Sequence, residues 1–190
     1  MKMTIPKLLL SFTITALLAA PALHAQDAKQ ERLMDDAENA KAAFTESNDQ
    51  LEELFEHAYA YAILPNVGKG AAGIGAAAGS GIVYEQGKAI GAVKMKQLTA
   101  GLQFGGQAYR EVIFFEDKAT LERFKTNEFE LTAQTSSTAI NAEGNKDATY
   151  KDGVLVFTQK KSGLMYDASI GGQKFNYDSF DACFWWFAPV

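Results

Sequence analysis

The sequence predicts an α+β protein in which N-terminal helices pack on a strongly curved, glycine-rich antiparallel β-sheet. With enough curvature, such a sheet would become barrel-like. Two observations carry this prediction. Apolar residues recur at helical spacing before Pro65, and from Gly70 onward the chain consists of short apolar segments punctuated by glycine. Because glycines at regular intervals let strands bend sharply, we expect the sheet to be curved.

The first 25 residues are typical of a secretory signal peptide. Lys2 and Lys7 give a basic start, an apolar stretch follows, and small residues end it at Ala25. Cleavage would leave a mature chain from about Gln26, without a later apolar run near the ~20 residues that span a bilayer. We therefore expect a soluble exported protein; an uncleaved N-terminal anchor is the alternative.

The remaining chain has the length of one structural domain. Residues 26–57 form its predicted N-terminal helical segment and residues 58–190 its α+β part. With 23 acidic and 18 basic residues, the formal net charge is −5, and loss of the two leader lysines makes it more negative. This balance argues against nucleic acid as a partner.

Two helices are predicted before the glycine run. The first carries an apolar stripe of Leu33, Ala37, Ala40 and Phe44. The second is expected from about Asn48 to Ile63, because Ser47 and Gln50 have capping-box spacing and Pro65 ends the pattern.

Short strands are then predicted over residues 73–84, 89–97, 100–107 and 110–115, forming an antiparallel meander with a turn at 85–88. Asp117 is expected to cap a short helix over 118–125, with Leu121 and Phe124 facing inward. A strand with one wet face is predicted around 129–133, and residues 141–150 are expected to form a loop. The continuous apolar run 154–158 indicates a central strand, with a turn at 160–163 and a returning strand at 164–170.

Three segments together resemble the SYLF domain family. They are AYAYAILPNVGKGAAGIGAAAGSGIVY (58–84), VIFFEDKATLERF (112–124) and VLVFTQKKSGLMYDASIGG (154–172), and they occur in the family's order. The resemblance implies a lipid-binding module, with phosphoinositides as ligands of eukaryotic members and actin as a partner of some. It also implies an N-terminal amphipathic helix that engages a bilayer. In a bacterial periplasm the corresponding ligands would be membrane phospholipids or other envelope lipids.

The candidate lipid-binding residues are cationic or aromatic. If the sheet gathers its lysines, they form a basic patch on an acidic protein; solvated surface lysines are the alternative. The tail aromatics could lie in a membrane interface or close the open end of the sheet. The candidates are Lys69, Lys94, Lys96, Lys160, Lys161, Lys174, Trp185 and Trp186.

Five glycines are candidates for close approach of a backbone or ligand, because they lack a Cβ. They are Gly70, Gly73, Gly75, Gly79 and Gly81. Their spacing does not match a dinucleotide loop in its required context, since no strand precedes the run. A tightly packed glycine strand is the favoured interpretation.

Catalytic and metal chemistry are not expected. One histidine, His57, follows the leader, on a predicted helix surface, and the single cysteine, Cys183, lies among aromatic residues as a small hydrophobe. Neither a metal cluster nor a serine-nucleophile motif occurs. The sequence therefore favours a non-enzymatic, cofactor-free lipid-binding protein of the cell envelope. The alternative is a periplasmic scaffold that binds protein or polysaccharide.

Overall fold

In the part of the chain that the computed structural model describes, three helices accompany a five-stranded sheet with the order β1-β2-β5-β3, and β4 pairs with β5 off this path. The structure describes the backbone of residues 8–127, 129–132, 138–139 and 150–180, with the side chains of 8–27, 132, 138–139 and 163–171 left aside. β1 (Ala60–Glu85), β2 (Lys88–Phe115) and β5 (Val154–Ser179) are long antiparallel partners. β3 (Glu130–Thr132) pairs antiparallel with β5, and β4 (Thr138–Ala139) pairs parallel with it. The predicted α+β class is confirmed, and the sheet stays open rather than closing into a barrel.

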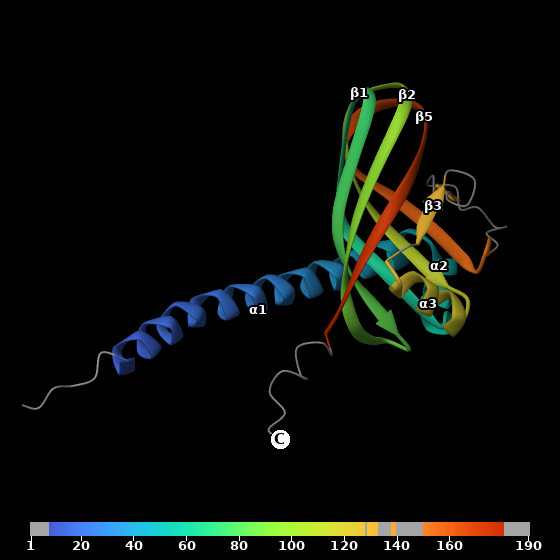
Figure 1. Cartoon of the computed structure of the whole chain (residues 1–190). Coiled ribbons are helices and arrows are strands. Elements are labelled where there is room, and N and C mark those ends of the chain that lie inside the picture. Colours follow the sequence, from blue (N-terminus) through green and yellow to red (C-terminus); the bar gives the residue numbers. More distant parts are fainter. Residues whose placement is uncertain (1–7, 128, 133–137, 140–149, 181–190) are drawn as a thin grey trace, which may run out of the picture.

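The three long strands rise together from the helices, bend over at the top and return (Figure 1). The bend brings the two halves of β1 into backbone contact. A Cβ added to Gly79 would lie 2.8 Å from Val67 Cγ2, and one added to Gly81 would overlap the carbonyl of Ile63. This crossing of β1 over itself, which only glycine permits, defines the shape of the sheet.

The predicted meander of short strands is wrong. Residues 89–115 form one strand without a turn, and residues 160–163 continue β5 instead of turning. Glycines and β-bulges between Ala72 and Ile74 and between Ala108 and Tyr109 bend the strands without interrupting their pairing. The one turn that joins β1 to β2 is the predicted one, with positive φ at Gln86 and Gly87 as a two-residue hairpin requires.

The predicted second helix ends too late. α2 covers Asp49–His57, and the apolar run that follows belongs to β1. Its N-cap is Asn48, whose Oδ1 accepts from Gln50 N at 2.9 Å, whereas the Ser47 hydroxyl donates to Phe44 O. Pro65 lies inside β1, which tolerates it because β1 is an edge strand and carries a bulge between Leu64 and Val67.

α1 (Leu8–Ser47) and α2 cover one side of the lower sheet, and α3 (Lys118–Lys125) packs on the other side. α1 packs the predicted stripe of Ala37, Ala40 and Phe44 against the sheet, together with Leu51 and Phe55 of α2. It begins within the predicted leader, and cleavage near Ala25 would leave all of these contacts in place. α3 starts at the predicted cap, where Asp117 Oδ1 accepts from Thr120 N at 2.8 Å, and buries Leu121 and Phe124.

Two hydrophobic clusters lie at the end of the sheet next to the helices, which we call the base. One lies beneath α1 and α2 and includes Tyr61, Val112 and Phe114. The other draws on both halves of the bent strands and on α3 and β3, with Phe115, Phe124 and Phe175 among its members. The predicted central strand is confirmed, since β5 lies between β2 and β3 and buries residues 154–157. Phe129 and Leu131 are buried as expected. Of the loop predicted over 141–150, residues 141–149 lie outside the described residues.

The crossing of β1 predicts that replacing Gly81 by a larger residue lowers the stability of the protein. Gly81→Ala should lower the free energy of unfolding by about 1–3 kcal/mol, because the added methyl group meets backbone that cannot move aside. Gly70→Ala is the matched control in the same strand, since a Cβ there has nothing within 4 Å. Urea unfolding of both variants measures the difference. Equal midpoints for the two would contradict the crossing.

Candidate functional site

The upper part of the bent sheet differs from its base, and we call it the tip: residues 68–78 of β1, 96–108 of β2 and 162–174 of β5. In β2, side chains alternate between an inner and an outer face. Odd-numbered residues face the other half of the sheet, and even-numbered residues face away from it. At the base both faces are buried, because helices cover the outer one.

The inner face of the tip is polar. Thr99 and Gln103 are buried there, and Thr99 Oγ1 donates to Gln103 Oε1 at 2.8 Å. Gln103 Nε2 donates to the carbonyls of Gly73 (3.2 Å) and Thr99 (3.0 Å), and so ties β2 to the bend of β1. A Cβ at Gly75 would lie 2.5 Å from Thr99 Oγ1, so this brace also requires glycine.

A buried carboxyl lies below the brace on the same face. Glu111 is fully buried, and its Oε2 accepts from Gln173 Nε2 at 3.0 Å, which links opposite halves of the sheet. Among the described residues, Glu111 Oε1 and Gln173 Oε1 have no hydrogen-bond partner. Burial raises the pKa of the Glu111 carboxyl to about 7, although the bond from Gln173 lowers it in part.

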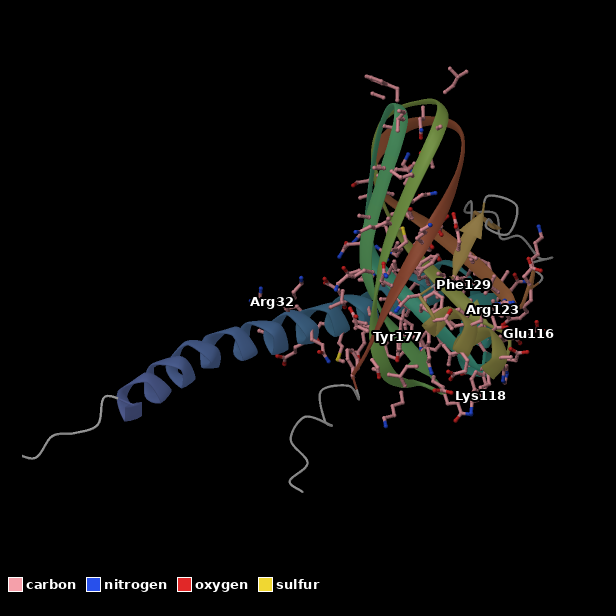
Figure 2. All side chains as sticks on the ribbon, in the orientation of Figure 1. Arg32, Glu116, Lys118, Arg123, Phe129 and Tyr177 are labelled. Atoms are coloured by element: carbon pink, nitrogen blue, oxygen red, sulfur yellow. The ribbon has the colours of Figure 1, made fainter. Side chains whose placement is uncertain are left out.

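The outer face of the tip is apolar and uncovered. Ile74, Leu98, Leu102 and Phe104 are 71–75% exposed, although residues of these types usually enter a core. Along β2 the outer positions from 98 to 108 are Leu, Ala, Leu, Phe, Gly and Ala. The labelled residues Arg123, Phe129 and Tyr177 lie at the base, whereas side chains at the upper end project into open space (Figure 2).

The strand register extends the outer face from β2 onto β1 and pairs the same stretch of β2 with β5 on its other side. Leu98, Ala100 and Phe104 of β2 pair with Ala76, Ile74 and Ala72 of β1. On the other side, Ala100, Leu102 and Phe104 pair with Ile170, Ala168 and Tyr166 of β5. The tip therefore has an inverted amphipathic pattern, polar inside and apolar outside. Exposed apolar patches of this kind mark binding surfaces rather than ordinary surface.

Cationic residues flank this apolar face where the tip meets the base. We call the two halves of the bent sheet its arms. On the arm before the bend of β2, Lys96 pairs in register with Lys174, and Lys94 makes an ion pair with Asp178 at 3.1 Å. Lys174 Nζ lies 3.9 Å from Glu130 Oε2. The β2 residue that ends the outer apolar run on the other arm is Arg110. We call these cations, with Lys160 and Lys161, the rim.

The bent sheet brings some predicted site residues together and separates others. Lys94, Lys96 and Lys174 are neighbours, whereas Lys160 and Lys161 lie on the other arm, where Lys161 Nζ donates to Asn66 Oδ1 at 2.5 Å. Lys69 pairs in register with Gln107, on the inner face. The lysines thus surround the tip instead of forming one patch. Trp185, Trp186 and Cys183 lie outside the described residues.

The predicted glycines divide by position. Gly75, Gly79 and Gly81 stand where another part of the sheet leaves no room for a Cβ. Gly70 and Gly73 have nothing within 4 Å of that position, and Gly73 has a φ of +81° at the bend. The four exposed apolar residues of the tip were not predicted as site residues. Their signal was the alternation of Leu98, Ala100, Leu102 and Phe104 with Thr99, Gly101 and Gln103.

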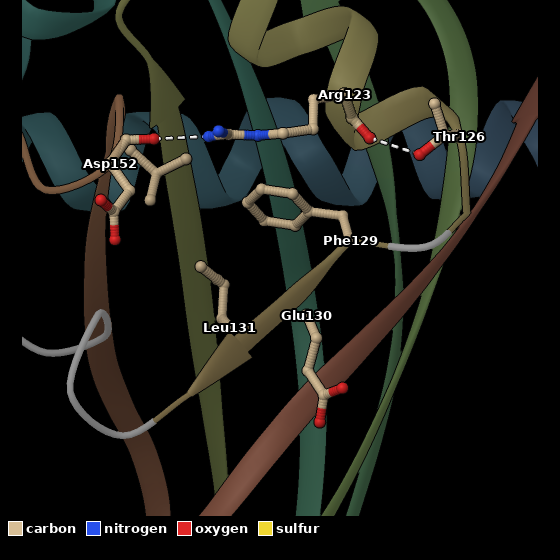
Figure 3. A pocket seen from close by; sticks show the side chains of 7 residues that line it. Arg123, Thr126, Phe129, Glu130, Leu131 and Asp152 are labelled. Carbon is tan, nitrogen blue, oxygen red and sulfur yellow. Dashed lines mark hydrogen bonds between the residues drawn. The ribbon is translucent and has the colours of Figure 1, made fainter.

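A pocket of about 440 Å³ lies at the base between α3, β3 and the start of β5 (Figure 3). The Arg123 guanidinium donates to the carbonyl of Asp152 at 2.5 Å and lies 5.7 Å from the centre of the Phe129 ring. Thr126 Oγ1 donates to Arg123 O at 2.8 Å. Because these polar groups already bond within the pocket wall, the pocket offers a ligand less than the tip does.

Other site types find no support in the described part of the chain. There, no group of three or more His, Cys, Asp or Glu side chains could hold a metal ion. His57 ends α2 at its exposed surface. Among the helices described, none combines the length and apolarity that a membrane span requires.

Comparison with known proteins identifies relatives. Residues 96–180 match the model of the Ysc84 family, described as "Las17-binding protein actin regulator". The chain is also 32% identical over 127 residues to beta cell expansion factor A of Aeromonas veronii, which covers 66% of this chain and 48% of that protein. The chain therefore spans about half the length of that relative. No solved structure matches the chain.

The buried Glu111 predicts a pH-dependent stability. Since folding raises its pKa from an ordinary 4.5 to about 7, the folded state holds the proton more tightly, so the free energy of unfolding should fall as pH rises from about 4.5 to 7. At 1.36 kcal/mol per pKa unit, the loss is on the order of 3 kcal/mol. Glu111→Gln, which stays neutral, should remove this slope, whereas the exposed Glu116→Gln should retain it. Parallel slopes for wild type and Glu111→Gln in urea unfolding would contradict the assignment.

Proposed function

Because the chain carries a domain of the SYLF (Ysc84) family of binding domains in residues 96–180, we propose that it binds lipid bilayers without catalysis, by inserting the tip into one leaflet. The observation that supports this proposal is the outer face of Ile74, Leu98, Leu102 and Phe104, apolar and uncovered. On the inner face, Thr99 and Gln103 bond to each other and to the carbonyl of Gly73 within the tip. From Leu98 to Ala108 the outer face of β2 therefore offers a bilayer only apolar side chains and glycine.

The size of the tip suits one leaflet. From Lys96 to the bend near Gly101 and Gln103, β2 rises about 20 Å at 3.3 Å per residue. Half of a hydrocarbon core of ~30 Å is about 15 Å. Insertion to the rim would therefore bury the apolar face in hydrocarbon and leave Lys96 and Lys174 at the level of the headgroups.

The rim would supply the attraction to anionic lipid that an acidic protein otherwise lacks. A basic residue near an anionic surface contributes about 1 kcal/mol. Asp178 and Glu130 partly offset Lys94 and Lys174, so Lys96, whose charge is exposed, would contribute most on its arm. We further propose that the protein is exported through its leader and acts on phospholipid of the cell envelope from the periplasm.

Co-sedimentation with phosphatidylcholine vesicles, with and without phosphatidylglycerol, tests the apolar part of this function. Leu102→Ser with Phe104→Ser should weaken binding at least tenfold, because each buried side chain contributes about 1.5–3 kcal/mol. Leu102→Ile with Phe104→Leu is the control that stays apolar, and it should bind like the wild type. Equal binding by the serine variant would exclude insertion of the tip.

The same assay separates the charge contribution. Lys96→Gln with Lys174→Gln should weaken binding to anionic vesicles by up to about 30-fold and flatten its dependence on salt. Lys88→Gln with Lys118→Gln changes the net charge equally at exposed positions away from the tip and should have little effect. If the wild-type protein binds no vesicle and retains no lipid on purification, the scaffold alternative replaces lipid binding.

A further inference from the structure

A pocket of about 480 Å³ lies at the rim, where the last turns of α1 meet β2 and β5. Its volume is in the range of clefts that hold small molecules. Most of its lining is polar: α1 contributes Glu46, β2 contributes Arg110, and β5 contributes Gln159, Lys160 and Lys161. We call it the rim pocket.

Cations outnumber acids in the wall of the rim pocket. Arg110, Lys160 and Lys161 stand against one carboxylate, that of Glu46. Side chains of consecutive strand residues ordinarily point to opposite faces. A β-bulge in the pairing of β2 with β5 leaves Lys161 without a register partner, so both lysines reach the same pocket. The pocket is therefore suited to an anion, although the net charge of the chain is −5.

Two buried polar atoms in the residues of this pocket lack a hydrogen bond. They are a donor, Arg110 Nε, and an acceptor, Gln159 Oε1, and neither has a partner in the part of the chain that the structure describes. Arg110 and Gln159 are neighbours in the strand register. Gln159 Nε2 donates to the carbonyl of Ala43 at 3.4 Å, which orients the amide. Because buried polar atoms are normally bonded, this pair indicates a ligand that both accepts and donates a hydrogen bond.

A phosphate diester that also carries a hydroxyl group meets both requirements. Its phosphate oxygens accept hydrogen bonds, and a guanidinium group binds them well. Its hydroxyl group can donate to an amide oxygen. We propose that the rim pocket binds the phosphoglycerol headgroup of a phospholipid, with Arg110 donating to the phosphate and Gln159 accepting from a glycerol hydroxyl.

The rim pocket lies at the depth of a headgroup if the tip inserts, and the assignment to a lipid rests on that proposed function. From the bend at Gln103 to Arg110, β2 extends about 23 Å at 3.3 Å per residue. Half of a bilayer with its headgroup regions is about 20–22 Å. An inserted tip would therefore bring Arg110 to the level of the phosphates, and one lipid could contact both the pocket and the apolar outer face.

Two phospholipids of equal charge test the recognition of the headgroup. Phosphatidylglycerol and phosphatidylmethanol are both phosphodiesters with one negative charge, but only phosphatidylglycerol has headgroup hydroxyls. In co-sedimentation, the wild-type protein should bind phosphatidylcholine vesicles that contain phosphatidylglycerol about fivefold more tightly than vesicles with the same fraction of phosphatidylmethanol, as one hydrogen bond predicts. Gln159→Met, which removes the acceptor, should bring this ratio toward one.

A matched pair of arginine variants tests the phosphate contact. Arg110→Lys keeps the positive charge but lacks the Nε donor, and it should weaken binding to phosphatidylglycerol vesicles at least fivefold. Arg32→Lys makes the same change at an exposed position of α1 outside the rim pocket and should bind like the wild type. Unchanged binding by Arg110→Lys, or an unchanged lipid ratio in Gln159→Met, would overturn the assignment of the pocket.

The lipid source and the proposed function are tested separately. Free glycerophosphoglycerol, the same headgroup without acyl chains, should bind the protein at least tenfold more weakly than vesicles do, because it makes no contact with the tip. Equal affinity would identify a soluble phosphodiester as the ligand and overturn the lipid source. If the wild type binds both kinds of vesicle equally, headgroup recognition fails and insertion of the tip stands. If it binds neither, the proposed function fails, and headgroup recognition fails with it.

Discussion

The backbone contact of β1 with itself at Gly79 and Gly81 is the constraint on which the rest of the structure depends. It holds the two halves of β1 together. Because β2 pairs with β1 and β5 with β2, the same contact sets how far all three strands extend beyond the helices before they return. At the crossing, α1 and α2 cover the outer side of the sheet. Beyond it nothing described covers that side. This contact therefore separates the three paired strands into a base with two buried faces and a tip with one.

The tip has the reverse polarity of a soluble domain, with polar side chains inside and apolar side chains outside. Gln103, Thr99 and the carbonyl of Gly73 bond to one another inside the bend, while Leu102 and Phe104 point outward. Side chains that would form a core in a closed sheet are here presented to the surroundings, above a rim of cations. This combination is the physical reason why we propose the tip, rather than the pocket at Arg123, as the binding surface.

Much of the fold could be predicted from the sequence, and the predictions that were wrong have a common cause. Local signals identified the first helix, the cap at Asp117, the turn at 85–88 and the central strand, because these depend on neighbouring residues. The unbroken β2 and β5 were missed, since glycines were taken as ends of strands where tertiary contact makes them bends. The arrangement of the site was missed for the same reason. The lysines were recognised as cations, but their arrangement around an apolar tip depends on the crossing of β1, which no local pattern encodes.

The depth of the tip in a bilayer tests the central claim most directly. In a Cys183→Ser background, a spin label attached through Phe104→Cys reports access to oxygen, which concentrates in hydrocarbon, and to a water-soluble nickel complex. We expect the label on vesicle-bound protein to be accessible to oxygen and shielded from nickel, while a label at Lys118→Cys at the base remains accessible to nickel. A label at position 104 that stays exposed to nickel on bound protein would contradict insertion of the tip.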